Sequence, residues 1–184
     1  MANLILLNKP FGVICQFRAA TNKTSLAEFI KLPDFYPAGR LDEDSEGLVL
    51  LTDDGSLQAR ISDPRYKLPK TYWAQVEGEI TPDALHRLAT GVDLKDGMTK
   101  SAKAQKLKHV PLPPRNPPIR YRAQVPTSWI SLILTEGKNR QVRRMTASVG
   151  FPTLRLFRSQ VGSWKVDDIG IGHYKMLKVN LPVR

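Results

Sequence analysis

An acidic turn followed by a buried strand is the most informative stretch of this sequence. Residues 39–52 run GRLDEDSEGLVLLT. Residues 48–52 form a continuous apolar run with β-branched members, which is typical of a strand buried on both faces. Leu41 is the only apolar side chain in the turn that precedes it, so we expect Leu41 to anchor that turn in the core. The buried strand would hold a carboxylate in such a turn rigidly, and the side of the carboxylate that faces away from the strand would stay accessible.

Short strands and short helices alternate along the rest of the chain. We predict strands over residues 4–7, 48–52, 70–76, 101–108, 129–135 and 153–157. We predict helices over residues 25–30, 57–61, 83–90 and 140–149, with N-caps at Ser25, Thr81 and Asn139. Five prolines within residues 111–118 predict a loop or extended arm. This pattern favours an α+β protein with a mainly antiparallel, mixed sheet and short flanking helices.

Composition limits the class of protein. The chain has 184 residues, 41% of them hydrophobic, and the lone Cys15 excludes an internal disulfide and a cysteine zinc cluster. The length fits one domain over residues 1–184. In an alternative form of this prediction, the domain consists of two lobes that share one sheet and a central cleft. No apolar run approaches the roughly 18 residues of a membrane span, and no secretory signal precedes the first strand. We therefore expect a cytoplasmic protein that does not bind membranes.

The charge is distributed unevenly. The chain carries 28 Lys and Arg against 17 Asp and Glu, a formal net charge of +11. Residues 97–160 hold 13 of the basic side chains and a single acidic one, Glu136, so this segment alone carries +12. Residues 42–54, in contrast, hold six acidic side chains and no basic one. A basic segment of this size predicts a polyanionic partner, and RNA or DNA is the first candidate.

The acidic turn has three interpretations. A calcium loop fits poorly, because position 12 would be Asp53 and an apolar strand fills the middle of the loop. A solvated turn without a role is the simpler interpretation for Glu43 and Asp44. The third interpretation is catalysis by one carboxylate, and spacing alone does not favour Asp42 over Asp44.

Three arginines lie together near the start of the helix predicted for residues 140–149. Arg140, Arg143 and Arg144 have i, i+3, i+4 spacing and therefore share one helix face. Guanidinium groups beside a helix N-terminus form an anion site, whose occupant is a phosphate or a partner carboxylate. The alternative is an exposed basic face, which is disfavoured because the helix contains no acidic residue to relieve the repulsion.

Four sequence blocks, taken together, resemble the RNA pseudouridine synthases. They are residues 8–12 (NKPFG), 39–48 (GRLDEDSEGL), 70–72 (KTY) and 137–145 (GKNRQVRRM). They occur in the family's order, and the resemblance runs from about residue 4 to residue 158. It points to the ribosomal branch, with type A for small-subunit RNA and types B, E and F for large-subunit RNA. Segments 115–120, 126–129 and 150–155 are most similar to the E type. The resemblance implies the pseudouridine synthase catalytic fold, without a separate N-terminal RNA-binding domain.

The resemblance also implies roles for individual residues. Asp42 would be the nucleophile, attacking either the anomeric carbon of the ribose or the base. Tyr72 would stack on the target base and accept a proton late in the reaction. Arg143 would pair with Asp42, with Arg140 as the runner-up. Further contacts to the substrate are expected from Lys9, Arg40, Lys138, Arg140 and Arg144. For Lys9 a surface turn without a role is an equal alternative.

The predicted function is isomerisation of a specific uridine to pseudouridine in the 23S RNA of the large ribosomal subunit. The uridine would leave its stack to reach Asp42. The family's chemistry needs no cofactor and no metal, and we expect a monomer with ribosomal RNA as its partner. Two alternatives stay open at this point. One is a non-catalytic RNA-binding or ribosome-assembly protein, and the other is a hydrolase that uses Asp42 with Asp44 or Glu46.

Overall fold

The chain folds into two compact units. The computed structural model describes residues 1–181. Unit 1 comprises Met1–Leu68 together with the described residues from Ser159 onward, and unit 2 comprises Pro69–Arg158. No helix among residues 1–181 has the length and apolar character that crossing a bilayer requires.

Most secondary-structure elements are short. The elements of unit 1 are β1 (Ala2–Lys9), β2 (Val13–Ile14), β3 (Thr24–Ser25), η1 (Leu26–Glu28), β4 (Tyr36–Pro37), β5 (Glu46–Thr52), α1 (Gly55–Ser62), η2 (Pro64–Tyr66), β12 (Trp164–Lys165) and β13 (Tyr174–Val179). Those of unit 2 are β6 (Lys70–Glu77), α2 (Pro82–Thr90), β7 (Asp93–Leu94), β8 (Gly97–Met98), β9 (Lys103–Leu107), β10 (Thr127–Leu134) and α3 (Gln141–Ser148). Strand β11 (Thr153–Val161) carries the chain from unit 2 into unit 1.

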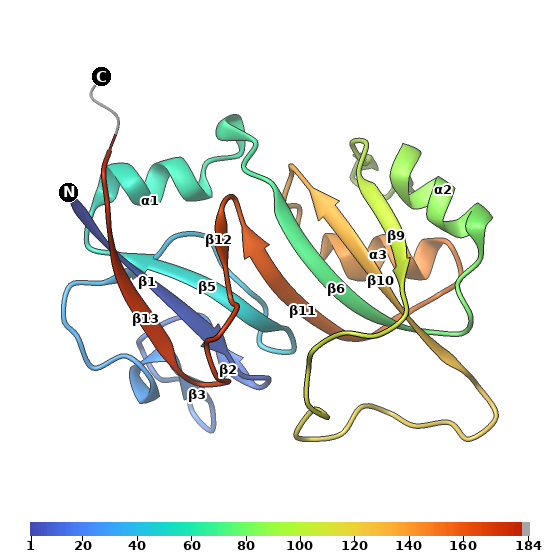
Figure 1. Ribbon diagram of the computed structural model, residues 1–184, viewed down its shortest axis with the longest axis horizontal. Helices are drawn as coiled ribbons and strands as arrows, with labels where there is room; N and C mark the ends of the chain where they lie inside the picture. Colours follow the sequence, from blue (N-terminus) through green and yellow to red (C-terminus); the bar gives the residue numbers. More distant parts are fainter. Residues whose placement is uncertain (182–184) are drawn as a thin grey trace. The chain divides into compact units, whose positions relative to one another are not determined.

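Unit 1 is built around β1, which pairs with β13 on one side and with β5 on the other (Figure 1). Both pairings are antiparallel, and β4 adds to β5 in the same sense. Every residue of β5 is buried, as its apolar run predicts. Ile5 of β1 lies opposite Leu51 of β5, and both belong to a core cluster that also contains Leu41. The predicted anchoring of the acidic turn by Leu41 is therefore confirmed.

Unit 2 contains antiparallel strands in the order β6, β10, β9. Its core joins the inward side chains of β6 and β10 to apolar residues of α2 and α3, such as Leu88 and Met145. Helix α2 begins as predicted, because the Thr81 hydroxyl accepts a hydrogen bond from the Ala84 amide. The antiparallel pairings, together with the short parallel pair β2–β3, confirm the predicted α+β class with a mainly antiparallel, mixed arrangement.

Several predicted boundaries need correction. The helix predicted for residues 25–30 is one 3-10 turn, η1, because the Ser25 hydroxyl accepts from the Ala27 amide and closes a tighter turn. Helix α3 begins at Gln141, and its N-cap is Arg140, not Asn139. The hairpin β7–β8 and strands β12 and β13 were not predicted, because each is very short or is largely exposed and lacks an apolar run.

Candidate active site

The acidic turn of unit 1 is anchored at both ends. Leu41 is 6% exposed and Ser45 is 1% exposed, whereas Asp42 between them is half-buried. The Ser45 amide donates to the Asp42 backbone carbonyl at 3.0 Å, which closes the turn. The Asp42 carboxylate therefore sits on a short, closed turn directly before a fully buried strand.

Lys9 ties this turn to the preceding β1–β2 connection. Its ammonium donates to the backbone carbonyls of Pro10 and Val13, each at 2.9 Å, and to that of Glu43 at 3.4 Å. The same Glu43 carbonyl accepts from the Gly12 amide at 2.8 Å. Two segments that are far apart in sequence are thus joined at one carbonyl of the acidic turn.

Lys9 lies in the interior and not on a surface turn, since its side chain is fully buried. Burial lowers the pKa of Lys9 to about 8, although Cys15 and the carboxylates of Glu46, Asp44 and Glu43 favour the charged form. Its ammonium binds backbone carbonyls, including that of Glu43 in the turn that carries Asp42, and the predicted contact of Lys9 with the substrate stays a prediction. The Glu43 carboxylate itself points to another cation, Lys23, at 2.7 Å.

The lowered pKa of Lys9 predicts a pH-dependent stability. Between pH 8 and 10.5 the unfolded chain holds a proton that the folded chain has released, so the free energy of unfolding rises with pH across this window. At about 1.4 kcal/mol per pKa unit, the full contribution is roughly 3 kcal/mol. We expect the Lys9→Met variant to lack this contribution in urea unfolding measured from pH 7 to 10. Parallel curves for the variant and the wild-type protein would contradict the assignment.

Tyr72 lies on β6 of unit 2. It is opposite Leu132 of β10, is half-buried, and packs against the core of the unit. The neighbouring Lys70 is also half-buried, and burial lowers its pKa, with a further lowering from the positive charge of Arg158. The predicted KTY block therefore places one aromatic ring and one desolvated cation on the same strand.

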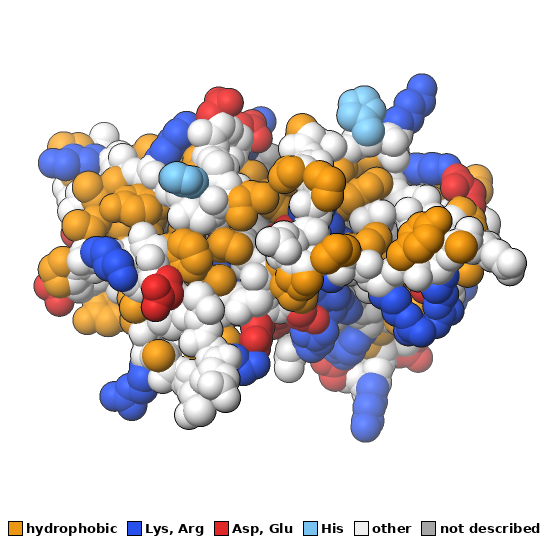
Figure 2. Space-filling model, turned by 90° about the horizontal axis from the view of Figure 1, so that it is seen from below, with side chains coloured by type: hydrophobic (Ala, Val, Ile, Leu, Met, Phe, Trp, Pro, Cys, Tyr) orange, Lys and Arg blue, Asp and Glu red, His pale blue; other side chains and the backbone are white. Residues whose placement is uncertain are grey.

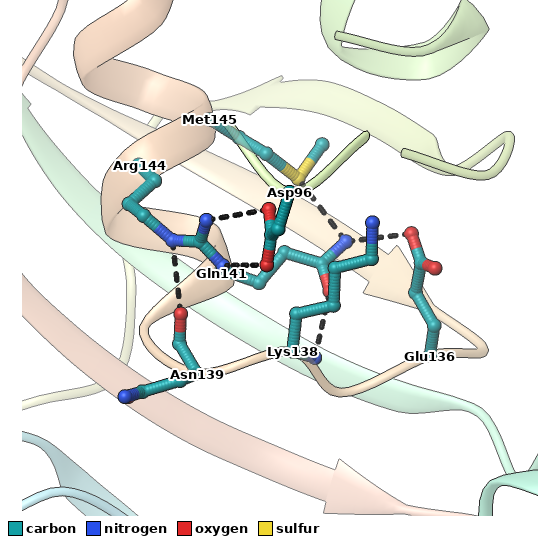
Figure 3. A network of polar contacts seen from close by, with 7 residues as sticks. All are labelled: Asp96, Glu136, Lys138, Asn139, Gln141, Arg144 and Met145. Atoms are coloured by element: carbon teal, nitrogen blue, oxygen red, sulfur yellow. Dashed lines mark hydrogen bonds and ion pairs between the residues drawn. The ribbon is translucent and has the colours of Figure 1, made fainter. Parts of the chain in front are cut away.

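The start of α3 is organised by side chains rather than by a capping residue. Arg140 has a left-handed backbone (φ 50°), and its side chain makes no cap hydrogen bond. Gln141, which is 4% exposed, donates from Nε2 to Glu136 Oε1 at 2.7 Å, and its Oε1 accepts from the Lys138 amide at 3.0 Å. Figure 3 shows these two contacts closing the loop in front of the helix.

Arg144 is held by groups of the protein itself. Its guanidinium donates to both carboxylate oxygens of Asp96, at 2.8 and 3.2 Å, and to the Asn139 carbonyl at 2.9 Å (Figure 3). The hydrogen bonds from Arg144 hold the pKa of Asp96 below its usual value, and the same pairing raises that of Arg144. The acid that relieves the repulsion among the arginines thus comes from the β7–β8 hairpin, 48 residues away, and not from the helix.

The basic segment is largely a surface feature of unit 2. In Figure 2, Lys and Arg side chains gather on the side of the view where Figure 1 draws β9 and β10. The exposed members of the segment include Lys100, Lys103, Lys106, Lys108, Arg120, Arg122 and Arg140. Two of them have acidic neighbours, since Arg122 pairs with Glu77 and Lys106 with Glu79. Arg155 and Arg158, in contrast, are buried.

The predicted site residues divide between the two units. Lys9, Arg40 and Asp42 belong to unit 1, with Arg40 exposed, whereas Tyr72 belongs to unit 2. The other basic site residues lie together at the start of α3, also in unit 2: Lys138, Arg140, Arg143 and Arg144. The pairing of Asp42 with Arg143 stays a prediction. Among residues 1–181, no three His, Cys, Asp or Glu side chains are arranged to hold a metal ion.

Sequence reasoning missed three polar residues of this site: Asp96, Glu136 and Gln141. One signal was visible for Glu136, because it is the only acidic residue between residues 97 and 160. No comparable signal marked Asp96, since its contact with Arg144 depends on a hairpin that the sequence pattern does not predict.

Comparisons with known proteins identify the family to which the chain belongs. The family model described as RNA pseudouridylate synthase matches residues 3–148, so the chain belongs to this family of isomerases that act on RNA. It is 56% identical over 167 residues to the "Ribosomal large subunit pseudouridine synthase E" of Xanthomonas axonopodis pv. citri, covering 89% of this chain and 88% of that relative. It is 48% identical over 179 residues to the protein of that name from Vibrio vulnificus, covering 97% and 76%. The predicted similarity to the E type is thereby confirmed.

Solved structures share the fold. A crystal structure of a pseudouridylate synthase, 29% identical in sequence, superposes with a TM-score of 0.81 and covers 97% of this chain and 71% of that one. Human RNA pseudouridylate synthase domain containing 1 shares the fold at 16% identity, with a TM-score of 0.57 over 86% of this chain and 74% of that one.

Proposed function

We propose that this protein converts one uridine of the large-subunit (23S) ribosomal RNA to pseudouridine. The observation that carries the proposal is the 56% identity, over 89% of the chain, to a relative named as a large-subunit pseudouridine synthase of the E type. The family membership favours this enzyme over a non-catalytic RNA-binding protein and over a two-carboxylate hydrolase. We further propose that the protein acts in the cytoplasm as a monomer, without a cofactor.

The reaction moves the uracil ring on its ribose. The bond between uracil N1 and the anomeric carbon breaks, the ring turns, and a bond forms from C5 to the same carbon. C5 then loses its proton and N1 gains one, so the product is an isomer of the substrate. The nucleophile in this proposal is the Asp42 carboxylate, which attacks either the anomeric carbon or the base, and its bond to the substrate breaks again as the product forms.

The other proposed roles rest on the resemblance of the sequence blocks to the family. Tyr72 stacks on the flipped base and accepts the C5 proton, directly or through solvent. Arg143, with Arg140 as the alternative, holds the Asp42 carboxylate through a guanidinium pair. The exposed cations of unit 2 bind flanking phosphates and offset the few kcal/mol that unstacking the uridine costs. Lys9 acts from the interior, by fixing the acidic turn.

The proposal is tested by mapping pseudouridine after incubation of the protein with unmodified ribosomal RNA. We expect one uridine of 23S RNA to be converted, with no added metal or cofactor. Binding without conversion would support the non-catalytic alternative. Conversion confined to small-subunit RNA would overturn the assignment of the substrate.

A further inference from the structure

The loop between β10 and α3 is closed by one pair of side chains. Glu136 Oε1 accepts two hydrogen bonds, from Gln141 Nε2 at 2.7 Å and from the Lys100 amide at 2.8 Å. Gln141 uses both ends of its amide, because its Oε1 accepts from the Lys138 amide at 3.0 Å. Its Nε2 also lies 3.6 Å from the Met145 sulfur, one helical turn further on. The pair thus joins the end of β10, the segment before β9 and the first turn of α3.

This arrangement replaces an ordinary helix cap. The N-cap residue is Arg140, whose left-handed backbone is a conformation that non-glycine residues rarely adopt. The backbone amide of Gln141 donates to the Lys138 carbonyl at 3.2 Å, and the side-chain oxygen of Gln141 accepts from the Lys138 amide. The backbone and the side chain of Gln141 therefore both bind Lys138. With Lys138 fixed on one side and the helix on the other, the backbone of Arg140 has little freedom.

Both candidate partners of the nucleophile depend on this loop. Arg140 immediately precedes Gln141 in the chain, and Arg143 follows it by two residues in the same helical turn. A guanidinium pair with a carboxylate needs a defined direction as well as a charge, and a displacement of about 1 Å can cost about 100-fold in rate. The hydrogen bonds of Gln141 and Glu136 fix the backbone from which the side chains of Arg140 and Arg143 extend.

We propose that Gln141 is a positioning residue for catalysis, which acts through Glu136 and the Lys138 amide to orient the arginines at the start of α3. This inference rests on the proposed function, because it assumes that one of these arginines meets the catalytic carboxylate. The polarity of the pair is specific. In the wild-type protein position 136 accepts twice, whereas position 141 donates once and accepts once.

The donor and the acceptor of the contact between residues 136 and 141 can be exchanged, and this gives a sharp test. Gln141→Glu places two carboxylates in contact and removes the donor at position 141. Adding Glu136→Gln lets the contact form in reverse: once its amide group turns, the nitrogen of residue 136 donates to the new carboxylate and its oxygen accepts from the Lys100 amide. The double variant also has the net charge of the wild-type protein, so long-range attraction to RNA is unchanged.

We expect Gln141→Glu to lower kcat for pseudouridine formation by about 10-fold or more, with KM for RNA within about 3-fold. Glu136→Gln alone keeps an acceptor oxygen, and we expect it to lower kcat less than Gln141→Glu does. The double variant should recover to within about 3-fold of the wild-type value. Asn139→Asp is the matched charge control, because it adds the same charge on an exposed side chain of the same loop. Its effect should fall on KM and not on kcat.

Amide hydrogen exchange at Lys138 and Lys100 gives a readout that does not depend on activity. Gln141→Glu should speed exchange at both amides, and the double variant should restore their protection. Restored protection with restored kcat supports the proposal. Restored protection with kcat still low would overturn it, because the loop would then be ordered without any benefit to catalysis. Failure of the wild-type protein to form pseudouridine is a separate result that overturns the proposed function and leaves the contact intact.

Discussion

Replacing Asp42 by asparagine is expected to abolish pseudouridine formation while the affinity for RNA stays within a few-fold. The amide has nearly the shape of the carboxylate but is a far weaker nucleophile, so the turn that Leu41 and Ser45 anchor should stay folded. Loss of a nucleophile typically lowers kcat by about 10⁴-fold or more. The measurement is a single-turnover assay on ribosomal RNA, combined with a filter-binding titration.

Asp44→Asn is the matched control for this prediction. It removes the same charge from the same acidic turn, two residues further along, and it leaves the Asp42 carboxylate in place. We expect its kcat to stay within about 5-fold of the wild-type value, since Asp44 is assigned no step of the reaction. Comparable losses in the two variants would favour a role for the acidic turn as a whole. Retained activity in Asp42→Asn would exclude Asp42 as the nucleophile.

The second large effect is expected at Arg143. Arg143→Ala should lower kcat by about 100-fold, the typical cost of removing one fixed donor from a reacting group. Arg143→Lys should restore little of the lost kcat, because an ammonium group cannot form the two parallel hydrogen bonds of a guanidinium group. Single-turnover rates at saturating RNA separate this effect from weaker binding.

The neighbouring Arg144 supplies the comparison. Arg144→Ala removes the same charge from the same helical turn, but its guanidinium is bonded to Asp96 and to the Asn139 carbonyl. We therefore expect its loss of kcat to be at least 10-fold smaller than that of Arg143→Ala. Equal losses would contradict the assignment to Arg143. A larger loss in Arg140→Ala than in Arg143→Ala would transfer the role to Arg140.

Short sequence patterns correctly predicted the features that depend on neighbouring residues, such as apolar runs and helix caps. The apolar run of residues 48–52 identified β5, and Thr81 followed by Pro82 marked the start of α2. Leu41 was predicted to be buried because it is the only apolar side chain in an acidic turn. In each case burial or capping is determined by residues within a few positions, which a sequence pattern records directly.

The contacts that organise the site were not predictable in the same way. A lysine beside a proline turn is usually exposed, yet Lys9 is buried because three carbonyls converge on its ammonium. The Arg144–Asp96 pair spans 48 residues and depends on a hairpin too short to leave a pattern. Asn139 has the side chain of an N-cap, but the contacts of Gln141 shift the start of the helix one residue further.

The order in which the units are completed during synthesis follows from the pairing of β1 with β13. Unit 2 is continuous in sequence, whereas unit 1 is interrupted by the 90 residues of Pro69–Arg158. At typical translation rates those residues take about 5 to 20 s to emerge. During that time one edge of β1 is unpaired, because β13, which later places Val179 opposite Ala2, has not yet been made. An unpaired strand edge can recruit other chains. The unit that carries the acidic turn is therefore the last to close, and the interval before β13 arrives is its period of greatest exposure to misassembly on the ribosome.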